Sequence, residues 1–201
     1  QMCIRDSSIN ILKAEMPGPT VDKLVPKSKD TARTLYIIYT ALTALEVIFL
    51  LLGGMSLFDS VVHALSTAGT GGFGAYNASA ANFSPYIQWV LTVFMFLFAI
   101  NFNLFYLILL GRMRDVFRNT EFRVYLAIVL VSVAVITAEI MPLYRTFSDS
   151  LRQAAFQVAS IISTTGFITA DFTVWTPLSK VLLLGLMFVG GCAGSTAGGL
   201  K

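Results

Sequence analysis

Charged side chains are scarce in this 201-residue chain: Asp, Glu, Lys and Arg together make up 12% of it, whereas 56% is hydrophobic. A typical soluble domain carries about 25% charged and about 45–50% apolar residues. Both departures point the same way and argue against a soluble enzyme domain. The mean hydropathy of +0.75 favours an integral membrane protein, in which each spanning helix needs about 20 apolar residues.

Residue types that carry covalent chemistry or bind metals are equally scarce. The sequence has one histidine, His63, and two cysteines, Cys3 and Cys192. Cys3 lies in a polar leader and Cys192 in an apolar segment, so we expect no disulfide between them. No Ser-His-Asp, Cys-His or clustered metal-ligand pattern is present, so we predict neither an enzyme nor a covalent cofactor. The formal net charge of +3 is too small to indicate a nucleic-acid partner.

Four apolar segments predict membrane-spanning helices. Residues 34–54, 86–110 and 124–141 are about long enough to cross a bilayer and carry few polar side chains. The fourth segment, residues 178–189, is short and runs into residues 190–199, which include five glycines. Because glycine is a poor helix former, we do not expect that helix to continue. The predicted fold class is therefore an all-α integral membrane protein.

Two shorter apolar stretches predict half-length helices. Residues 59–68 and 150–162 can reach only about halfway through a bilayer, as a re-entrant helix does. Asp59 and residues 148–150 supply N-cap signals, and each stretch ends in a Gly/Thr-rich segment. We therefore expect each helix to enter the membrane and its chain to return to the same side.

Basic residues predict the orientation. Eleven of the 14 lie in the leader (residues 1–33), in the loop 111–123 and at the last position. By the positive-inside rule, the leader and this loop are cytoplasmic, and both half-length helices enter from outside. Two units remain, residues 34–110 and 124–201. Residues 1–7 resemble a translated sequencing adaptor, so we expect the natural chain to begin further upstream.

The two units are copies of one repeat. Thr70-Gly71 aligns with Thr165-Gly166 at a spacing of 95, and Ser84-Pro85 with Thr176-Pro177 at a spacing of 92. Each unit consists of a span, a half-length helix, a Thr-Gly segment, an outer loop and a second span. Both copies run in the same direction, so we predict parallel repeats around an axis along the membrane normal.

A Gly/Thr segment at the tip of a half-length helix has a specific physical use. Non-helical backbone is tolerated at membrane depth only where it is buried in protein or lines a watery cavity. Glycine permits backbone angles that turn carbonyl oxygens toward one axis, and rings of such oxygens replace the hydration shell of potassium. The C-terminus of the helix carries about half a negative charge, which favours a cation. Residues 66–74 and 160–168 contain no carboxylate, so backbone oxygens are the predicted ligands.

Three segments, residues 66–73, 163–167 and 190–201, resemble the Trk/Ktr/HKT potassium transporters. Members of that family resemble a tetrameric potassium channel fused into one chain, with four span–pore loop–span repeats. The resemblance covers residues 34–201 and implies that this chain carries the second and third repeats, the latter cut inside its last helix. It implies potassium uptake through a filter of backbone carbonyls, with potassium as the transported ion.

The resemblance also implies an ion filter and a gate. The filter residues that it implies are Gly69, Thr70, Gly71, Gly72, Thr164, Thr165, Gly166 and Phe167. Gly71 and Gly166 are its central glycines, although extra glycines on both sides of Thr70-Gly71 leave open which carbonyls face the ion in the first loop. The gate is an intramembrane loop beneath the filter, formed here by Gly190, Gly191, Gly194, Ser195, Thr196, Gly198 and Gly199. Implied partners are a second copy (a homodimer), a cytosolic nucleotide-binding regulatory subunit of the TrkA/KtrA type, and membrane lipid.

Polar residues inside the spans are further candidates. Glu46 and Glu139 are acids within apolar segments, where such residues are functional by default. We expect them to brace the pore loops by hydrogen bonds, with ion binding as the alternative. Asn101 is expected to bond to a neighbouring helix or to line an inner cavity, and His63 to be packed or hydrogen-bonded.

Three alternatives stay open at this point. Gly190, Gly194 and Gly198 also match the small-residue ladder of packed transmembrane helices. A sodium or other monovalent-cation transporter of the same family shares this layout. A small-solute secondary transporter has broken helices as well, although it normally shows an inverted repeat.

Overall fold

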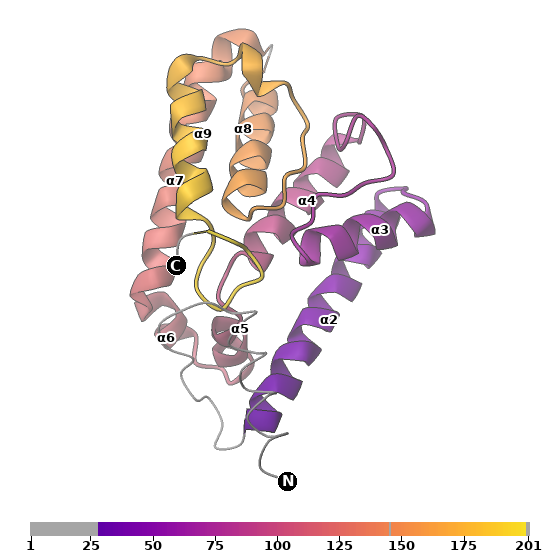
Figure 1. Ribbon diagram of the computed structural model, residues 1–201, viewed down its shortest axis with the longest axis vertical. Coiled ribbons are helices and arrows are strands. Elements are labelled where there is room, and N and C mark those ends of the chain that lie inside the picture. The colour runs from indigo at the N-terminus through magenta and orange to yellow at the C-terminus, as the bar shows by residue number, and fades with distance from the viewer. Residues whose placement is uncertain (1–27, 145, 200–201) are drawn as a thin grey trace.

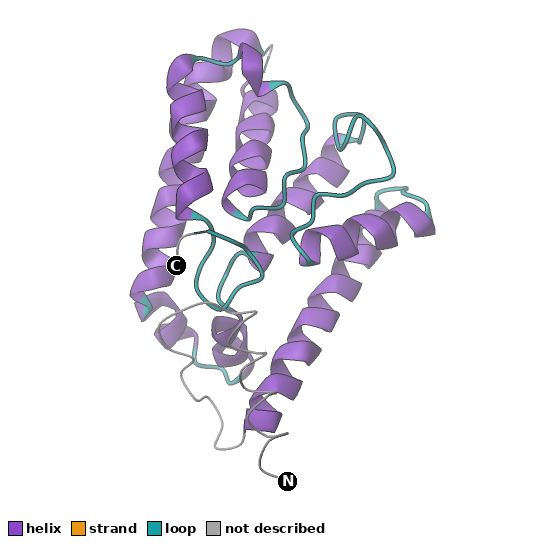
Figure 2. Cartoon of the chain, in the orientation of Figure 1, coloured by secondary structure: helices purple, strands orange, loops and turns teal. Residues whose placement is uncertain are grey.

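The structure of the protein, a computed structural model, describes residues 28–144 and 146–199 and is all-helical over these residues (Figures 1 and 2). Its α-helices are α2 (Ser28–Leu52), α3 (Leu57–Ala68), α4 (Pro85–Phe98), α5 (Phe102–Leu109), α6 (Met113–Arg118), α7 (Thr120–Ile140), α8 (Phe147–Ile162) and α9 (Pro177–Val189). Two short 3-10 helices are η1 (Met141–Leu143) and η2 (Phe172–Val174). The predicted all-α class is confirmed. Residues 1–27 of the predicted leader lie outside the described residues.

Two helices have the length and composition of membrane spans, as the sequence predicts. They cover Arg33–Leu52 of α2 and Thr120–Leu143, which comprises α7 and η1. The cap of α7 is Asn119, whose side-chain oxygen accepts a hydrogen bond from the amide of Phe122 (3.0 Å). This bond satisfies one of the amides left unpaired at a helix start.

The half-length helices α3 and α8 end where the sequence predicts, but the N-caps predicted at Asp59 and at residues 148–150 are wrong. The caps are Ser56 and Thr146, whose hydroxyls accept hydrogen bonds from the amides three residues later (3.1 and 3.2 Å). The same hydroxyls donate to the carboxylates of Asp59 and Asp149 (2.8 and 2.6 Å). An acid three residues after a Ser or Thr supports a helix start in the manner of a capping box.

The second span of the first repeat is broken, so the prediction of one helix over residues 86–110 is wrong. α4 and α5 meet at an angle of 93°. Asn101 caps α5, because its side-chain oxygen accepts a hydrogen bond from the amide of Asn103 (2.9 Å). Asparagine competes with helical hydrogen bonds and therefore favours a cap over a helix interior. α4 has 14 residues and α9 has 13, so both second spans break at nearly the same depth.

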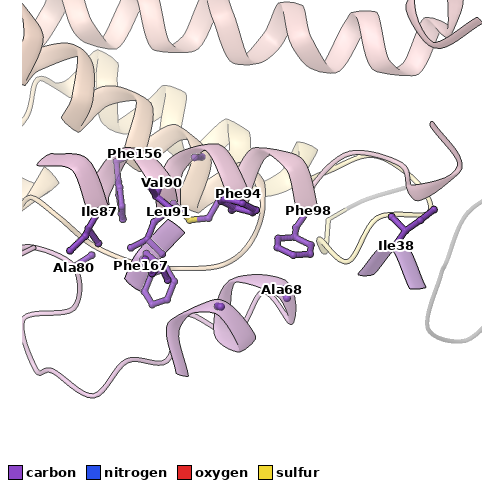
Figure 3. Packing of buried hydrophobic residues seen from close by; sticks show 14 of the residues in the cluster. Ile38, Ala68, Ala80, Ile87, Val90, Leu91, Phe94, Phe98, Phe156 and Phe167 are labelled. Atoms are coloured by element: carbon purple, nitrogen blue, oxygen red, sulfur yellow. The ribbon is translucent and has the colours of Figure 1, made fainter. Parts of the chain in front are cut away.

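Of two hydrophobic core clusters, one joins the two predicted repeats. α4 lies between the α2–α3 pair and the group formed by α7, α8 and α9 (Figure 1). Its side chains Leu91, Phe94 and Phe98 belong to the same buried cluster as Phe156 of α8 and Phe167 of the following loop (Figure 3). Burying one large apolar side chain stabilises a fold by about 1.5–3 kcal/mol. This core therefore fixes the loop after α8 against the first repeat.

Candidate functional site

The segments that follow α3 and α8 share one backbone conformation. Thr70 and Thr164 both have a positive φ (50° and 56°), and so do Gly72 and Gly166 (67° and 90°). A positive φ is uncommon for threonine and costs energy, so its presence in both loops marks equivalent positions. The spacing between the loops is therefore 94, not the predicted 95, and Gly72 corresponds to Gly166.

Hydrogen bonds at the two helix ends give the same spacing. The amides of Gly71 and Thr165 donate to the carbonyls of Ser66 and Ser160 (2.8 and 3.0 Å). The predicted pairing of Gly71 with Gly166 is therefore wrong, and Gly71 corresponds to Thr165. Matching two Thr-Gly dipeptides misplaced the register by one residue, because the geometry of the helix end fixes the backbone whatever residues follow.

A serine braces each loop from within. The Ser66 hydroxyl accepts a hydrogen bond from the amide of Phe73, and the Ser160 hydroxyl donates to the carbonyl of Phe167 (both 2.6 Å). Each serine thus joins its half-length helix to the far end of the loop and limits how the loop can bend. Neither serine was among the predicted site residues. In the sequence, each serine lies six positions before the positive-φ glycine of its own loop, Gly72 or Gly166.

Ser160→Ala is expected to lower the melting temperature of the purified protein. The substitution leaves the buried carbonyl of Phe167 without this donor, which costs about 1–3 kcal/mol. Each kcal/mol lowers the melting temperature of a protein of this size by about 2–4 °C. Thermal unfolding in detergent measures the change, with Ser148→Ala as the control because Ser148 is exposed on the same helix. Equal melting temperatures for the two variants would contradict the brace.

The two loops lie against each other. A Cβ atom placed on Gly72 would lie 2.1 Å from the carbonyl oxygen of Thr165, so the close approach requires glycine. Beyond the Gly/Thr segments in each loop, the amide of Ala80 donates to the carbonyl of Ile168 (3.0 Å). The amide of Ile168 donates in return to the hydroxyl of Ser79 (3.1 Å). These contacts fix the position of one loop relative to the other.

Aromatic packing distinguishes the two loops. Phe167 is fully buried and stacks on His63 of α3, with ring centroids 5.7 Å apart. His63 is buried as well, with its Nδ1 2.7 Å from the carbonyl oxygen of Asp59, and it meets Phe83 edge-on at 5.1 Å. Phe73 is the equivalent of Phe167 but is 78% exposed. Within the described residues, the first loop therefore has no counterpart of the support that His63 gives to the second.

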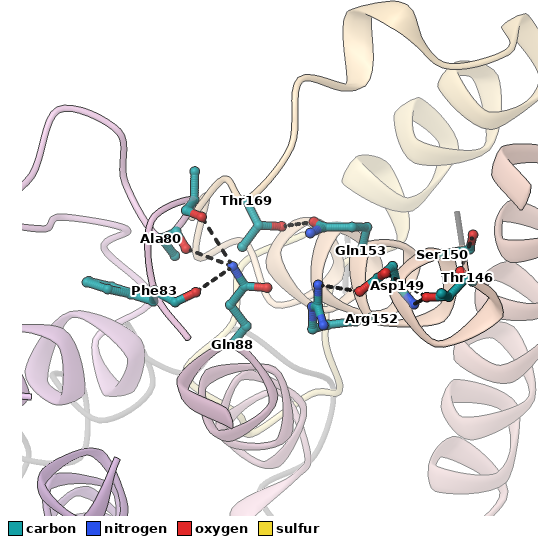
Figure 4. A network of polar contacts seen from close by, with 10 residues as sticks. Ala80, Phe83, Gln88, Thr146, Asp149, Ser150, Arg152, Gln153 and Thr169 are labelled. Atoms are coloured by element: carbon teal, nitrogen blue, oxygen red, sulfur yellow. Dashed lines mark hydrogen bonds and ion pairs between the residues drawn. The ribbon is translucent and has the colours of Figure 1, made fainter. Parts of the chain in front are cut away.

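Side-chain amides hold the outer loops (Figure 4). The amide nitrogen of Gln88 in α4 donates to the carbonyls of Ala80 and Phe83 (both 3.2 Å). The hydroxyl of Thr169 donates to the side-chain oxygen of Gln153 in α8 (2.6 Å). Loop carbonyls removed from water need such partners. A glutamine inside an apolar span is the sequence signal for this role.

Residues 190–199 form an irregular loop that follows α9 and lies at the break between α4 and α5 (Figure 1). The amide of Gly191 donates to the carbonyl of Gly198 (3.2 Å), which closes the loop on itself. Gly190 and Gly194 have positive φ angles of 66° and 72°. Because the segment is not helical, the alternative of a helix-packing glycine ladder is wrong.

The loop fills the break between α4 and α5. The amide of Cys192 donates to the carbonyl of Ala99 (2.9 Å), and the amide of Phe102 donates to the carbonyl of Gly194 (3.0 Å). A Cβ atom on Gly194 would lie 3.0 Å from the side-chain oxygen of Asn101. Asn101 therefore caps its own helix α5 and lies next to Gly194 of the loop, which differs from the predicted bond to a neighbouring helix. The loop pairs the backbone groups that the broken helix leaves open.

The same loop touches both Gly/Thr segments. The amide of Gly198 donates to the hydroxyl of Thr164 (2.8 Å), and the hydroxyl of Thr70 donates to the carbonyl of Thr196 (3.2 Å). The Thr196 hydroxyl donates to the carbonyl of Phe98 at the end of α4 (3.2 Å). Two of the predicted gate residues thus contact the two equivalent threonines of the predicted filter.

The two acids within spans differ from the expected braces. Glu46 is fully buried, and its carboxylate oxygens have no hydrogen-bond partner among the described residues. The nearby hydroxyl of Thr67 is committed to the carbonyl of His63 (2.8 Å). Glu139 is half-buried on α7. In the described part of the chain, no group of three His, Cys, Asp or Glu side chains can hold a metal ion.

These features define the class of the protein: an all-helical membrane protein in which half-length helices end in paired, non-helical loops. A family model described as TrkH, cation transport protein, matches residues 4–201, and the chain belongs to that family. The predicted family is thus confirmed. It is a family of transporters, not of enzymes.

Named relatives cover almost the whole chain. The Trk system potassium uptake protein TrkH of Salmonella typhimurium is 39% identical over 198 residues, which are 96% of this chain and 41% of the relative. TrkG of Escherichia coli, a potassium uptake protein of the same system, is 34% identical over 95% of this chain and 40% of its own length. The crystal structure of the potassium transporter TrkH from Vibrio parahaemolyticus matches with a TM-score of 0.83 and 34% identity, over 96% of this chain and 42% of that one. The chain thus spans about two fifths of the length of these relatives.

Proposed function

We propose that the protein admits potassium ions across a bacterial inner membrane, through a filter of backbone carbonyls that the intramembrane loop gates. The names of its relatives support potassium as the ion. The observation that carries the proposal is the shared conformation of the two loops, in which a threonine and a glycine two residues later both have a positive φ. Alternation of this kind can direct successive carbonyl oxygens to one side, where they replace water around an ion.

Electrostatics favours a cation at these loops. α3 and α8 both end there, and each helix C-terminus carries about half a negative charge. Residues 66–74 and 160–168 contain no Asp or Glu. Fixed carbonyl dipoles thus provide the attraction, and the ion can leave again because no full charge holds it. The proposed filter residues are Gly69, Thr70, Gly71, Gly72, Thr164, Thr165, Gly166 and Phe167.

The exposed Phe73 supports a ring of more than two repeats. In the second loop, the equivalent Phe167 is covered by His63, which belongs to the half-length helix of the preceding repeat. A further repeat before α2 would place its own half-length helix against Phe73 in the same way. We therefore propose that this chain supplies two of four repeats around one pore, and that half a filter alone conducts nothing.

The gate in this proposal is the loop 190–199. It lies between the two Gly/Thr segments and the break that separates α4 from α5. It forms hydrogen bonds to both Gly/Thr segments and to the backbone at the break. A glycine-rich loop can change conformation at low cost, so it can obstruct the pore in one state and withdraw in another. Its proposed gating residues are Gly190, Gly191, Gly194, Ser195, Thr196, Gly198 and Gly199.

The basic loop 111–123 is the proposed cytoplasmic contact. Arg112 forms an ion pair with Asp115 (2.6 Å), whereas Arg114, Arg118 and Arg123 are exposed. Exposed arginines attract anionic lipid headgroups and can also meet a cytosolic protein. The relatives are named as members of a Trk system, which supports a partner protein. As partners we propose a nucleotide-binding regulatory subunit of the TrkA/KtrA type and a second copy of the membrane subunit.

Rubidium uptake by potassium-uptake-deficient cells that express the complete gene tests the proposal. We expect uptake above that of the empty vector, and we expect Gly166→Ser to reduce the preference for rubidium over sodium by about tenfold or more. Serine at a φ of 90° is strained by about 1–3 kcal/mol, so the loop is expected to leave this conformation, and its carbonyl oxygens then lose the arrangement that replaces the hydration shell of the larger ion. A wild-type preference for sodium would favour a sodium transporter, and unchanged selectivity in the variant would contradict the role of Gly166.

A further inference from the structure

The intramembrane loop has a contact of a different kind from its backbone hydrogen bonds. The amide of Ala193, at the tip of the loop, donates to the carboxylate of Glu121. Glu121 lies in the first turn of α7, 72 residues earlier in the chain. Hydrogen bonds to an ionised acceptor are roughly twice as strong as neutral ones. A single charged side chain from another segment thus holds the tip of the proposed gate.

The position of Glu121 is fixed by the start of α7. Asn119 caps this helix through the amide of Phe122 (3.0 Å), so the backbone around Glu121 is held in place. The N-terminus of a helix also favours a negative charge in its first turn. The exposed carboxylate is therefore fixed to the start of α7 and moves together with it.

The start of α7, which carries Glu121, directly follows the proposed cytoplasmic segment. α7 follows α6 and the exposed arginines of the loop 111–123 after a single residue, Asn119. A displacement of α6 therefore reaches Glu121 through one turn of chain. The tip of the loop and the proposed docking segment are joined by a continuous path of α6, the α7 cap, Glu121 and Ala193.

We infer that Glu121 is a positioning residue that holds the intramembrane loop in its closed place and couples it to the cytoplasmic loop. The inference rests on the proposed function for what the loop does, but the contact itself is independent of the identity of the ion. Loss of the acceptor releases the tip. Gly190 and Gly199 then allow the loop to swing, since both have positive φ angles and no side chain to obstruct it.

Glu121 variants of the complete protein test this inference with two readouts. The first is the rate at which a membrane-permeant maleimide labels Cys192, which is 4% exposed in the loop, with Cys192→Ser as the blank. The second is rubidium uptake. We expect Glu121→Ala to raise both by about tenfold, the shift that follows loss of one charge-assisted hydrogen bond near the surface. Glu121→Gln keeps an oxygen acceptor at the same reach but loses the charge, so it should raise both by only about threefold, between the wild type and Glu121→Ala.

Two further variants separate the hydrogen bond from charge and from general damage. Glu121→Asp keeps the charge but shortens the side chain by one methylene, so it should behave like Glu121→Ala even if the alanine variant fails to accumulate. Thr120→Ala, on the exposed neighbouring residue, should match the wild type. Unchanged labelling in both the Ala and Asp variants, or equal labelling in the Gln and Ala variants, would overturn the inference. Faster labelling without faster uptake would uphold the contact and overturn the proposed gate.

Discussion

Gly72→Ala is expected to reduce rubidium uptake and selectivity to near background, whereas Gly71→Ala should retain at least a third of wild-type uptake. A Cβ atom on Gly72 would lie 2.1 Å from the carbonyl oxygen of Thr165, and Gly72 has a φ of 67°. Alanine there must displace the backbone of the neighbouring loop and also adopt a strained conformation, at about 1–3 kcal/mol for each effect. At Gly71 the nearest atom is a ring carbon of Phe73 at 2.9 Å, and a side chain can turn aside.

The comparison of these two alanine variants decides between the two registers of the repeat. Uptake of rubidium in the presence of competing sodium measures both activity and selectivity, and the amount of protein in the membrane normalises the rates. Ala75→Gly, at an exposed position just after the loop, controls for changes in the segment as such. A larger defect in Gly71→Ala than in Gly72→Ala would restore the spacing of 95 and contradict the equivalence of Gly72 and Gly166.

The lengths of the helices could be predicted from the sequence because the bilayer sets them. α2, α7 and α9 and the C-terminal ends of α3 and α8 lie where apolar length and glycine content place them. The bend between α4 and α5 could not be predicted in this way. No glycine or proline marks Ala99–Asn101, and the break is stabilised by the loop 190–199, which is remote in sequence.

The candidate site shows a different limit. The sequence identifies both Gly/Thr segments, because threonine and glycine are the residues that such a backbone needs. Their register also lies in the sequence, because Ser66, Thr70, Gly72 and Phe73 match Ser160, Thr164, Gly166 and Phe167 at a spacing of 94. This match is longer than that of the two Thr-Gly dipeptides, which gave the wrong spacing of 95. The roles of Ser66 and Ser160 could not be predicted from the sequence. Their hydroxyls act on the backbone of residues seven positions later, a distance at which no helical or strand periodicity makes the two ends neighbours.

Deletion of residues 191–198 is expected to increase rubidium uptake at least tenfold while the preference over sodium stays within about twofold of the wild type. The deletion removes the loop that contacts the proposed filter and the break between α4 and α5. It can be made with little distortion, because a Cβ atom on Gly190 would lie only 2.6 Å from the Cα atom of Gly199. The two ends are thus already neighbours and can be joined directly.

The size of the effect follows from the number of bonds that hold the loop. Its amides, carbonyls and hydroxyls bond to Ala99, Phe102 and Phe98 on one side and to Thr70 and Thr164 on the other. At about 1 kcal/mol net for each hydrogen bond, the closed arrangement is favoured by several kcal/mol, and its removal shifts the pore far toward the open state. The filter carbonyls keep their own braces, so selectivity should survive.

A replacement of the same length separates obstruction from contact. Exchange of residues 191–198 for eight Gly/Ser residues keeps the bulk of the loop but loses the specific side chains, so uptake should fall between those of the wild type and the deletion. Rubidium and sodium uptake are measured in the same cells, with membrane insertion checked by protease accessibility of the loop 111–123. Unchanged or lower flux in a correctly inserted deletion variant would mean that the loop supports the pore instead of closing it. In that case the bonds to Thr70 and Thr164 would be the reason, because both threonines would lose a partner that holds the filter in shape.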